Sequence, residues 1–291
     1  MKELLIISGK GGTGKTTVLG SFAALARNQV LADADVDAPN LHLLLSPEPK
    51  DERPYSGAGL AIVDEALCIE CGRCDEVCEF DAVRNHKVDP NRCEGCGTCA
   101  LICPANAITM HPQITGHVYI SSTRFGLLAH ARLHAGAEAS GRLVTEVRDV
   151  ARKLATEQKA DLILTDGSPG IGCPVIASLS GVDVALAVTE PTPSGVHDLR
   201  RVLAVSAHFG VPTGVCINKW DLNPTLADKI EREAKEMKAK PMGRIPFDED
   251  ISNAIAEGMP VVEHSKGEGA TAITNLWHEM VEFGAFDGQE G

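Results

Sequence analysis

The chain has 291 residues, of which 44% are hydrophobic and 23% charged, and its mean hydropathy is −0.02. These values are typical of a globular protein with a sizeable core, and the length allows one large domain or two smaller ones. The 40 acidic and 27 basic residues give a net charge of −13, which disfavours nucleic acid as a partner. Residues 1–3 lead directly into an apolar segment, and no stretch resembles a signal peptide or a membrane span. We therefore expect a cytoplasmic protein with no membrane partner.

The first predicted strand, residues 4–7, runs into a glycine-rich segment at residues 9–16 that reads Gly-Lys-Gly-Gly-Thr-Gly-Lys-Thr, and a helix is predicted for residues 17–26. This order and spacing predict a phosphate-binding loop in which Lys15 contacts the β- and γ-phosphates and the Thr16 hydroxyl binds Mg²⁺. The alternative, a glycine-rich turn that binds nothing, is disfavoured by the flanking strand and helix. The predicted nucleotide-binding residues of the loop are Gly9, Lys10, Gly11, Gly12, Thr13, Gly14, Lys15, Thr16 and Thr17.

Carboxylates follow two further apolar strands. Residues 30–32 lead into Asp33, Asp35 and Asp37, and residues 161–165 lead into Asp166. At strand ends beside a phosphate loop, carboxylates can hold Mg²⁺ and orient the attacking water. A solvated acidic turn is the alternative for the first group, but three aspartates at alternate positions favour function. We expect a Mg²⁺ site formed by Thr16, Asp33 and Asp166, with Asp166 in the Walker B role.

Strands and helices alternate through the rest of the chain. Strands are predicted for residues 182–189 and 214–217, and a helix from Glu138 to about Gln158. The alternation predicts an α/β fold with a doubly wound, mainly parallel sheet, as in P-loop NTPases. Residues 218–221, Asn-Lys-Trp-Asp, resemble the guanine-reading motif of small GTPases, so GTP remains an alternative to ATP.

Eight of the ten cysteines form a repeated pattern between residues 68 and 103. Each run has three cysteines at C-x2-C-x2-C spacing and a fourth that is separated from the third by three residues (C-x3-C), the ligand spacing of bacterial two-cluster ferredoxins. The fourth cysteine of each run ligates the other cluster, so the spacing divides the ligands between two [4Fe–4S] clusters. Zinc sites are the alternative, disfavoured because neither run contains histidine. The predicted ligands are Cys68, Cys71, Cys74 and Cys103 for one cluster and Cys93, Cys96, Cys99 and Cys78 for the other.

The cysteine repeat also divides the chain. Residues 59–112 are predicted to form an inserted, small α+β ferredoxin domain of the bacterial two-cluster type, and residues 1–58 and 113–291 to form the P-loop domain. Residues 47–59 and 112–116, with their prolines and glycines, are predicted linkers. Because the insert leaves the P-loop domain soon after Asp35, a nucleotide-driven movement would reach it through little intervening chain.

These motifs together resemble the MinD/Mrp branch of P-loop ATPases, the deviant Walker A class, in a form that carries an inserted two-[4Fe–4S] ferredoxin domain. The resemblance rests on the loop Lys10–Lys15, Asp33-x-Asp35, Asp166-Gly-Ser-Pro-Gly, the segment Glu190–Asp198, Asn218-Lys219 and the eight cysteines.

The resemblance implies a homodimer joined through its nucleotide face, in which Lys10 contacts the nucleotide of the partner subunit. It implies that Asp35 positions the attacking water, although the role of Asp37 is not separable from it, and that the catalytic residues are Lys10, Lys15, Asp35 and Asp166. Asn218 matches an asparagine that recognises adenine, which favours ATP over GTP. Pro246 and Phe247 match a region lining the base, although Phe247 fits ordinary packing equally well.

Other residues have simpler interpretations. Cys216 is expected to be a small buried hydrophobe, and packing is favoured for Cys173 over a bridging cluster. His130 and His134 are predicted on a helix, as a solvated face rather than a metal site. The acidic tail, residues 274–283, is predicted to be a packed helix because it lacks the basic residues of a membrane-binding helix.

Three functions follow as hypotheses. The favoured one is an ATPase that gates electron transfer from the two clusters to an unidentified protein partner. The second is an ATPase that assembles or carries metal clusters for a client protein, and the third is a spatial regulator of a protein complex.

Overall fold

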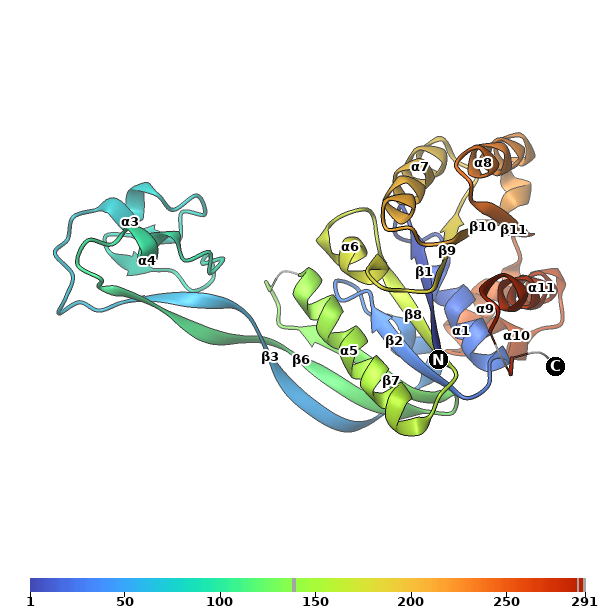
Figure 1. The fold of residues 1–291 in the computed structure, drawn as a ribbon, viewed down its shortest axis with the longest axis horizontal. Coiled ribbons are helices and arrows are strands. Elements are labelled where there is room, and N and C mark those ends of the chain that lie inside the picture. Colours follow the sequence, from blue (N-terminus) through green and yellow to red (C-terminus); the bar gives the residue numbers. More distant parts are fainter. Residues whose placement is uncertain (138–139, 287, 290–291) are drawn as a thin grey trace. The chain divides into compact units, whose positions relative to one another are not determined.

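The structure is a computed structural model that describes residues 1–137, 140–286, 288 and 289. The described residues divide into two compact units (Figure 1). Unit 1 comprises Met1–Glu52, Val118–Arg132 and the described residues of Ala139–Gly291, and unit 2 comprises Arg53–His117 and the described residues of Leu133–Glu138. The predicted start of the long helix, at Glu138 and Ala139, lies outside the described residues.

Strands and helices alternate in unit 1, as expected, and unit 2 contributes further short strands and helices between Arg53 and His117. The strands are β1 (Lys2–Ser8), β2 (Gln29–Ala34), β3 (Glu48–Val63), β4 (Val83–Arg84), β5 (Lys87–Val88), β6 (Ile108–Thr123), β7 (Gly126–Leu133), β8 (Leu162–Pro169), β9 (Val184–Thr189), β10 (Thr213–Asn218) and β11 (Lys240–Ile245). The helices are α1 (Lys15–Leu25), α2 (Leu41–Leu45), α3 (Arg73–Glu76), α4 (Thr98–Ile102), α5 (Gly141–Gln158), α6 (Cys173–Leu179), α7 (Pro193–His208), the 3₁₀ helix η1 (Trp220–Leu222), α8 (Pro224–Glu236), α9 (Glu249–Ala256), α10 (Val261–His264) and α11 (Glu268–Gly284).

Within the described residues, nine strands form one sheet in the order β11-β10-β9-β1-β8-β2-β7-β6-β3. β1 pairs in parallel with β8 and β9, and parallel pairing continues to β2 and β7 on one side and to β10 and β11 on the other. The predicted mainly parallel α/β sheet is therefore confirmed. Asp33 in β2 lies opposite Asp166 in β8, which brings the predicted carboxylates together.

The central strand β1 is buried on both faces, as helix-covered parallel strands are. Leu4 and Ile6 pack into one apolar cluster and Leu5 and Ile7 into another, because successive side chains of a strand point to opposite faces. Residues of α1, α9, α10 and α11 complete the first cluster and residues of α6, α7 and α8 the second. The phosphate-loop segment thus begins from the most enclosed part of the sheet.

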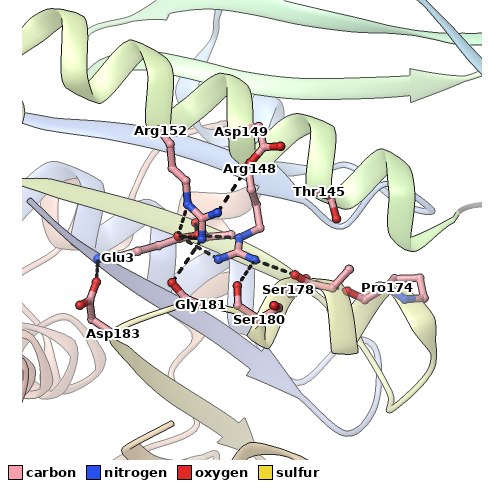
Figure 2. A network of polar contacts seen from close by, with 12 residues as sticks. Glu3, Thr145, Arg148, Asp149, Arg152, Pro174, Ser178, Ser180, Gly181 and Asp183 are labelled. Carbon is pink, nitrogen blue, oxygen red and sulfur yellow. Dashed lines mark hydrogen bonds and ion pairs between the residues drawn. The ribbon is translucent and has the colours of Figure 1, made fainter. Parts of the chain in front are cut away.

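A buried ion-pair network ties α5 to the start of β1 (Figure 2). Glu3, only 4% exposed, accepts two hydrogen bonds from Arg148, at 2.8 Å and 2.9 Å, and others from Arg152 and the Thr165 hydroxyl. Arg148 also donates to the carbonyl oxygens of Ala177 and Ser180. The network holds α5, β1 and the end of α6 to one another.

Two predicted linkers are strands instead. Residues 48–63 and 108–123 form β3 and β6, which carry the chain into and out of unit 2. Pro54 lies in β3, which is the edge strand of the sheet, and edge strands are where proline is tolerated. The predicted domain boundaries, between residues 58 and 59 and between 112 and 113, fall inside these two strands.

The predicted helix around His130 and His134 is wrong, because Gly126–Leu133 is strand β7. His130 is 6% exposed, its Nε2 lies 2.9 Å from the Ser121 hydroxyl, and its ring stacks on Tyr119. A spacing of four residues places two side chains on one face of a strand as well as of a helix, so the spacing did not distinguish them. Burial in the sheet lowers the pKa of His130 to about 4.

The C-terminal segment packs as predicted. Trp277 and Met280 of α11 are buried, and Trp277 meets Phe22 of α1 with their ring centroids 5.0 Å apart. In the part of the chain that the structure describes, no helix combines the length and the apolar character needed to cross a membrane.

Candidate functional site

The phosphate-loop segment connects β1 to α1. Gly14, the residue before α1, has φ of +98°, and a Cβ there would lie 2.5 Å from the Asn218 side-chain nitrogen, so only glycine fits. Lys15 is the first residue of α1 and is 5% exposed, with its Nζ 3.8 Å from Asp35 Oδ2. Lys10, by contrast, is exposed. The two lysines of the loop are therefore placed differently, one beside the buried carboxylates and one in solvent.

The Thr16 hydroxyl lies between two acceptors. Its oxygen is 2.6 Å from Asp166 Oδ2 and 2.7 Å from Asn40 Oδ1. Asp166 was predicted here, but Asn40 was not given a role. Asn40 ends the segment Asp33–Asn40 and reaches the phosphate loop only in the folded chain. In the sequence, the only signal for it was an amide residue that follows three spaced aspartates.

Asp33 organises the turn that carries Asp35. Its two carboxylate oxygens accept hydrogen bonds from the backbone N–H groups of Asp35, at 3.2 Å, and Leu41, at 3.1 Å. Asp35 is 5% exposed and faces Lys15, whereas Asp37 is exposed. The structure thus separates two aspartates that the sequence left equivalent.

The three buried carboxylates repel one another. Burial, with the charge of Asp166, holds the pKa of Asp33 well above its ordinary value. Burial also raises the pKa of Asp35, against the effect of Lys15, and raises that of Asp166 to about 6. Such a group of carboxylates around one lysine is suited to a bound cation.

Unpartnered oxygens at this site fit Mg²⁺. Thr13 Oγ1, Asp35 Oδ1 and Asp166 Oδ1 are buried and have no hydrogen-bond partner among the described residues. Hydroxyl and carboxylate oxygens are the ligands that Mg²⁺ prefers. The residues present therefore fit a Mg²⁺ held by Thr16 and Asp166, with Asp33 opposite Asp166 on the neighbouring strand.

The predicted base-binding residues lie on β10, β11 and the loops after them. The Asn218 amide donates to the Thr13 carbonyl at 2.9 Å and accepts from the Lys219 N–H at 3.0 Å, so it anchors the phosphate loop. Asp221 accepts a hydrogen bond from the Phe247 N–H at 2.7 Å. Phe247 is 51% exposed and Pro246 is half-buried. Phe247 is therefore outside the apolar core of this chain.

In unit 2 the eight repeated cysteines line two separate cavities. One cavity is lined by Cys68, Cys71, Cys74 and Cys103. A second cavity is lined by Cys78, Cys93, Cys96 and Cys99. These are the two sets into which the spacing divides the cysteines, each with three from one run and the fourth from the other. All ten cysteines of the chain are free thiols.

The two cysteine runs are held in the same way. The Ala82 N–H donates to Cys78 Sγ and the Ala107 N–H donates to Cys103 Sγ, both at 3.3 Å. Each run continues into a short helix, α3 or α4, before its fourth cysteine. Free sulfur ligands, backbone donors to sulfur and enclosed, mainly apolar walls are the surroundings that an iron–sulfur cluster requires.

The two remaining cysteines lie in unit 1. Cys216 is fully buried in β10, as predicted, and burial raises the pKa of its thiol to about 12. Cys173 is exposed at the start of α6, which excludes the predicted packing role within this chain.

The fold and the phosphate loop define the chain as an α/β P-loop nucleotide-binding protein. Comparison with known proteins makes this specific: residues 4–261 match the CbiA family, described as the CobQ/CobB/MinD/ParA nucleotide binding domain, and the chain belongs to that family. The protein is accordingly an ATPase of the MinD/ParA type.

Individual relatives span almost the whole chain. An uncharacterised protein of Methanocaldococcus jannaschii is 35% identical over 284 residues, which cover 97% of each chain. An iron–sulfur cluster carrier protein of the same organism is 22% identical over 280 residues, 89% of this chain and 77% of that protein. The crystal structure of the cell division ATPase MinD of Pyrococcus furiosus has a TM-score of 0.62 at 22% identity and covers 97% of this chain and 99% of that one.

Proposed function

We propose that this ATPase is a nucleotide-switched homodimer whose unit 2 is a ferredoxin domain with two [4Fe–4S] clusters, and that ATP binding gates electron transfer from them to a protein partner. The observation that carries the proposal is the division of eight cysteines between two cavities, four to each. Four thiolates around one enclosed space satisfy one [4Fe–4S] cluster, and zinc sites would not need two interleaved runs.

In the nucleotide site, Lys15 and the backbone of residues 9–16 bind the phosphates, and Thr16 and Asp166 hold Mg²⁺. Asp35, buried beside Lys15, orients the attacking water. The exposed Lys10 reaches the nucleotide of the partner subunit, and Asn218, Pro246 and Phe247 surround the base, with ATP favoured. When bound, each cluster would supply one-electron redox chemistry.

The nucleotide site is connected to unit 2 by a short stretch of chain. Asn40, which is hydrogen-bonded to Thr16, is followed by α2 and then by β3, and β3 passes into unit 2 at Arg53. Rearrangement of residues 35–40 when nucleotide binds is therefore communicated through α2 and β3. This connection supports gating over two independent activities.

A role in cluster assembly is the second candidate, favoured by the similarity to an iron–sulfur cluster carrier protein over 89% of the chain. A transferred cluster needs an accessible, incompletely ligated site, whereas the eight cysteines of unit 2 provide full ligation for two retained clusters. We therefore place this function second.

Iron analysis of the full-length chain, reconstituted under anaerobic conditions, tests the proposal. We expect about eight iron and eight sulfide per chain, from two [4Fe–4S] clusters. Cys71→Ser should lower the stable iron content, while Cys173→Ser, outside the repeat, should leave it unchanged. About four iron or fewer in the wild-type chain after full reconstitution would end the case for two clusters.

A further inference from the structure

Apart from the cysteines, the two cavities have different lining residues. The imidazole of His86 lines the cavity of Cys68, Cys71, Cys74 and Cys103, whereas Met110 lines the other. His86 Nδ1 is buried and has no hydrogen-bond partner within the described residues. His86 Nδ1 can carry a proton, and it therefore lacks an acceptor for that proton although His86 lines a cavity with four cysteines.

The backbone holds His86 in place. Asn85 and His86 form the two-residue turn between β4 and β5, with φ of +49° and +62°, a left-handed conformation in which glycine is the usual residue at the second position. The Asp75 carboxylate accepts the N–H groups of Asn85, at 2.8 Å, and His86, at 3.4 Å. Asp75 therefore fixes the tip of the hairpin against α3.

This arrangement brings the ring to one particular ligand. A ring nitrogen of His86, Cys74 Sγ and an Asp75 carboxylate oxygen all lie within 4.8 Å of one another. In the second run the residue after the third cysteine is Ala100, and after a turn at residues 104–105 the chain continues into the long strand β6, with no hairpin like the one between β4 and β5. The two cysteine runs are equivalent, but the second run has no counterpart of His86.

The second cavity has its own donor. The Thr98 hydroxyl lies 3.4 Å from Cys96 Sγ, and the equivalent residue in the first run is Arg73. Arg73 and His86 line the first cavity and Thr98 lines the second, so the side chains able to donate to sulfur differ between the two sites.

We propose that His86 donates an N–H hydrogen bond to a sulfur of the cluster held by Cys68, Cys71, Cys74 and Cys103, and so raises the reduction potential of that cluster alone. The inference rests on the proposed clusters. Reduction adds negative charge to the cluster sulfurs, so a donor stabilises the reduced form more than the oxidised form. His86 tunes the reduction potential through this hydrogen bond. It does not bind iron, because the four cysteines complete the ligand set.

An anaerobic redox titration of the reconstituted full-length chain, followed by electron paramagnetic resonance, tests this. In His86→Phe, which keeps a ring but removes its N–H, half of the reduced-cluster signal should appear at a lower potential and the other half should not move. His86→Gly, which suits the left-handed backbone and has no side-chain donor, should give the same result. Thr98→Val should lower the potential of the other half only.

His111→Phe is the matched control, because His111 lies outside both cavity linings and bonds to Thr109; it should move neither potential. An unchanged titration in both His86 variants, or an equal shift of both clusters, would overturn the role of His86. Iron content distinguishes failure of this inference from failure of the proposed clusters. About eight iron per chain with unshifted potentials would contradict the role of His86 alone. A wild-type chain that does not retain iron would contradict the proposed clusters themselves.

Discussion

At the scale of single residues, the Thr16 hydroxyl shows how the predicted metal site depends on a residue that the sequence did not reveal. It has one proton and two acceptors, Asp166 at 2.6 Å and Asn40 at 2.7 Å. When Mg²⁺ occupies the oxygens of Thr16 and Asp166, the proton is directed to Asn40. Asn40→Ala should therefore weaken Mg²⁺ binding to the ADP complex roughly tenfold, as loss of a partner of a metal ligand does.

Isothermal titration calorimetry with Mg²⁺ on the ADP-saturated chain measures this effect. The matched control is Asp37→Asn, because Asp37 belongs to the same turn but is exposed, and its affinity should equal that of the wild type. Equal losses in the two variants would show that the turn is merely sensitive to substitution.

Asp166 makes the stability of the nucleotide-free chain depend on pH. Burial raises its pKa from 3.8 to about 6, so the folded state binds this proton more tightly than the unfolded state. Its contribution is therefore complete below pH 4 and is lost as pH rises through about 6, a difference on the order of 3 kcal/mol. Asp166→Asn should accordingly be more stable than the wild type at pH 7 and lose that advantage at pH 4.

Thermal unfolding of both chains between pH 4 and pH 8, without Mg²⁺ or nucleotide, measures the difference. Saturating Mg·ADP should reduce the advantage of the variant at pH 7, because the cation then neutralises the wild-type carboxylates. A difference in melting temperature that is constant with pH would contradict the assigned shift.

At the scale of elements, the buried network of Glu3, Arg148 and Arg152 fastens α5 to β1 (Figure 2). Glu3→Gln keeps the shape but leaves Arg148, 3% exposed, without its counter-charge. Removing one partner of a buried pair costs about 3–5 kcal/mol, so we expect a loss of that size. Glu157→Gln, which breaks an exposed pair with Lys153 at 3.8 Å, should cost less than about 1 kcal/mol.

Urea unfolding followed by tryptophan fluorescence suits this test, since both tryptophans, Trp220 and Trp277, lie in unit 1. Similar unfolding midpoints for the two variants would contradict a stabilising role for the network.

Some strands could be predicted from the sequence and others could not. The strands β1, β8, β9 and β10 are continuous apolar runs buried on both faces, so composition alone identified them. β3 carries prolines and charges and β6 a proline and two histidines, and both are strands because they pair with each other, which depends on residues far apart in the sequence. His86 escaped notice for a related reason: only the folded hairpin brings it to cysteines that lie earlier in the sequence.

At the scale of the whole molecule, the loop Asp35–Asn40 is joined to unit 2 by α2 and β3 alone on its C-terminal side. If nucleotide gates the clusters, coupling must appear in both directions, because linkage requires that reduction and ATP binding affect each other equally. We expect reduction of the clusters to change the dissociation constant for Mg·ATP roughly fivefold, at the low end of allosteric couplings. A fivefold change corresponds to a shift of about 40 mV in a one-electron potential.

Asp35→Asn, which keeps the buried site but should not hydrolyse ATP, allows both sides of this equality to be measured at equilibrium. Mg·ATP titrations of the dithionite-reduced and oxidised chains give the ratio of dissociation constants, and redox titrations with and without Mg·ATP give the shift in potential. Lys15→Ala, which should not bind ATP, must show no nucleotide-dependent shift. A ratio of dissociation constants that matches the shift in reduction potential would establish gating. Identical Mg·ATP affinities in the two redox states would mean that the ATPase and the clusters act independently on one chain.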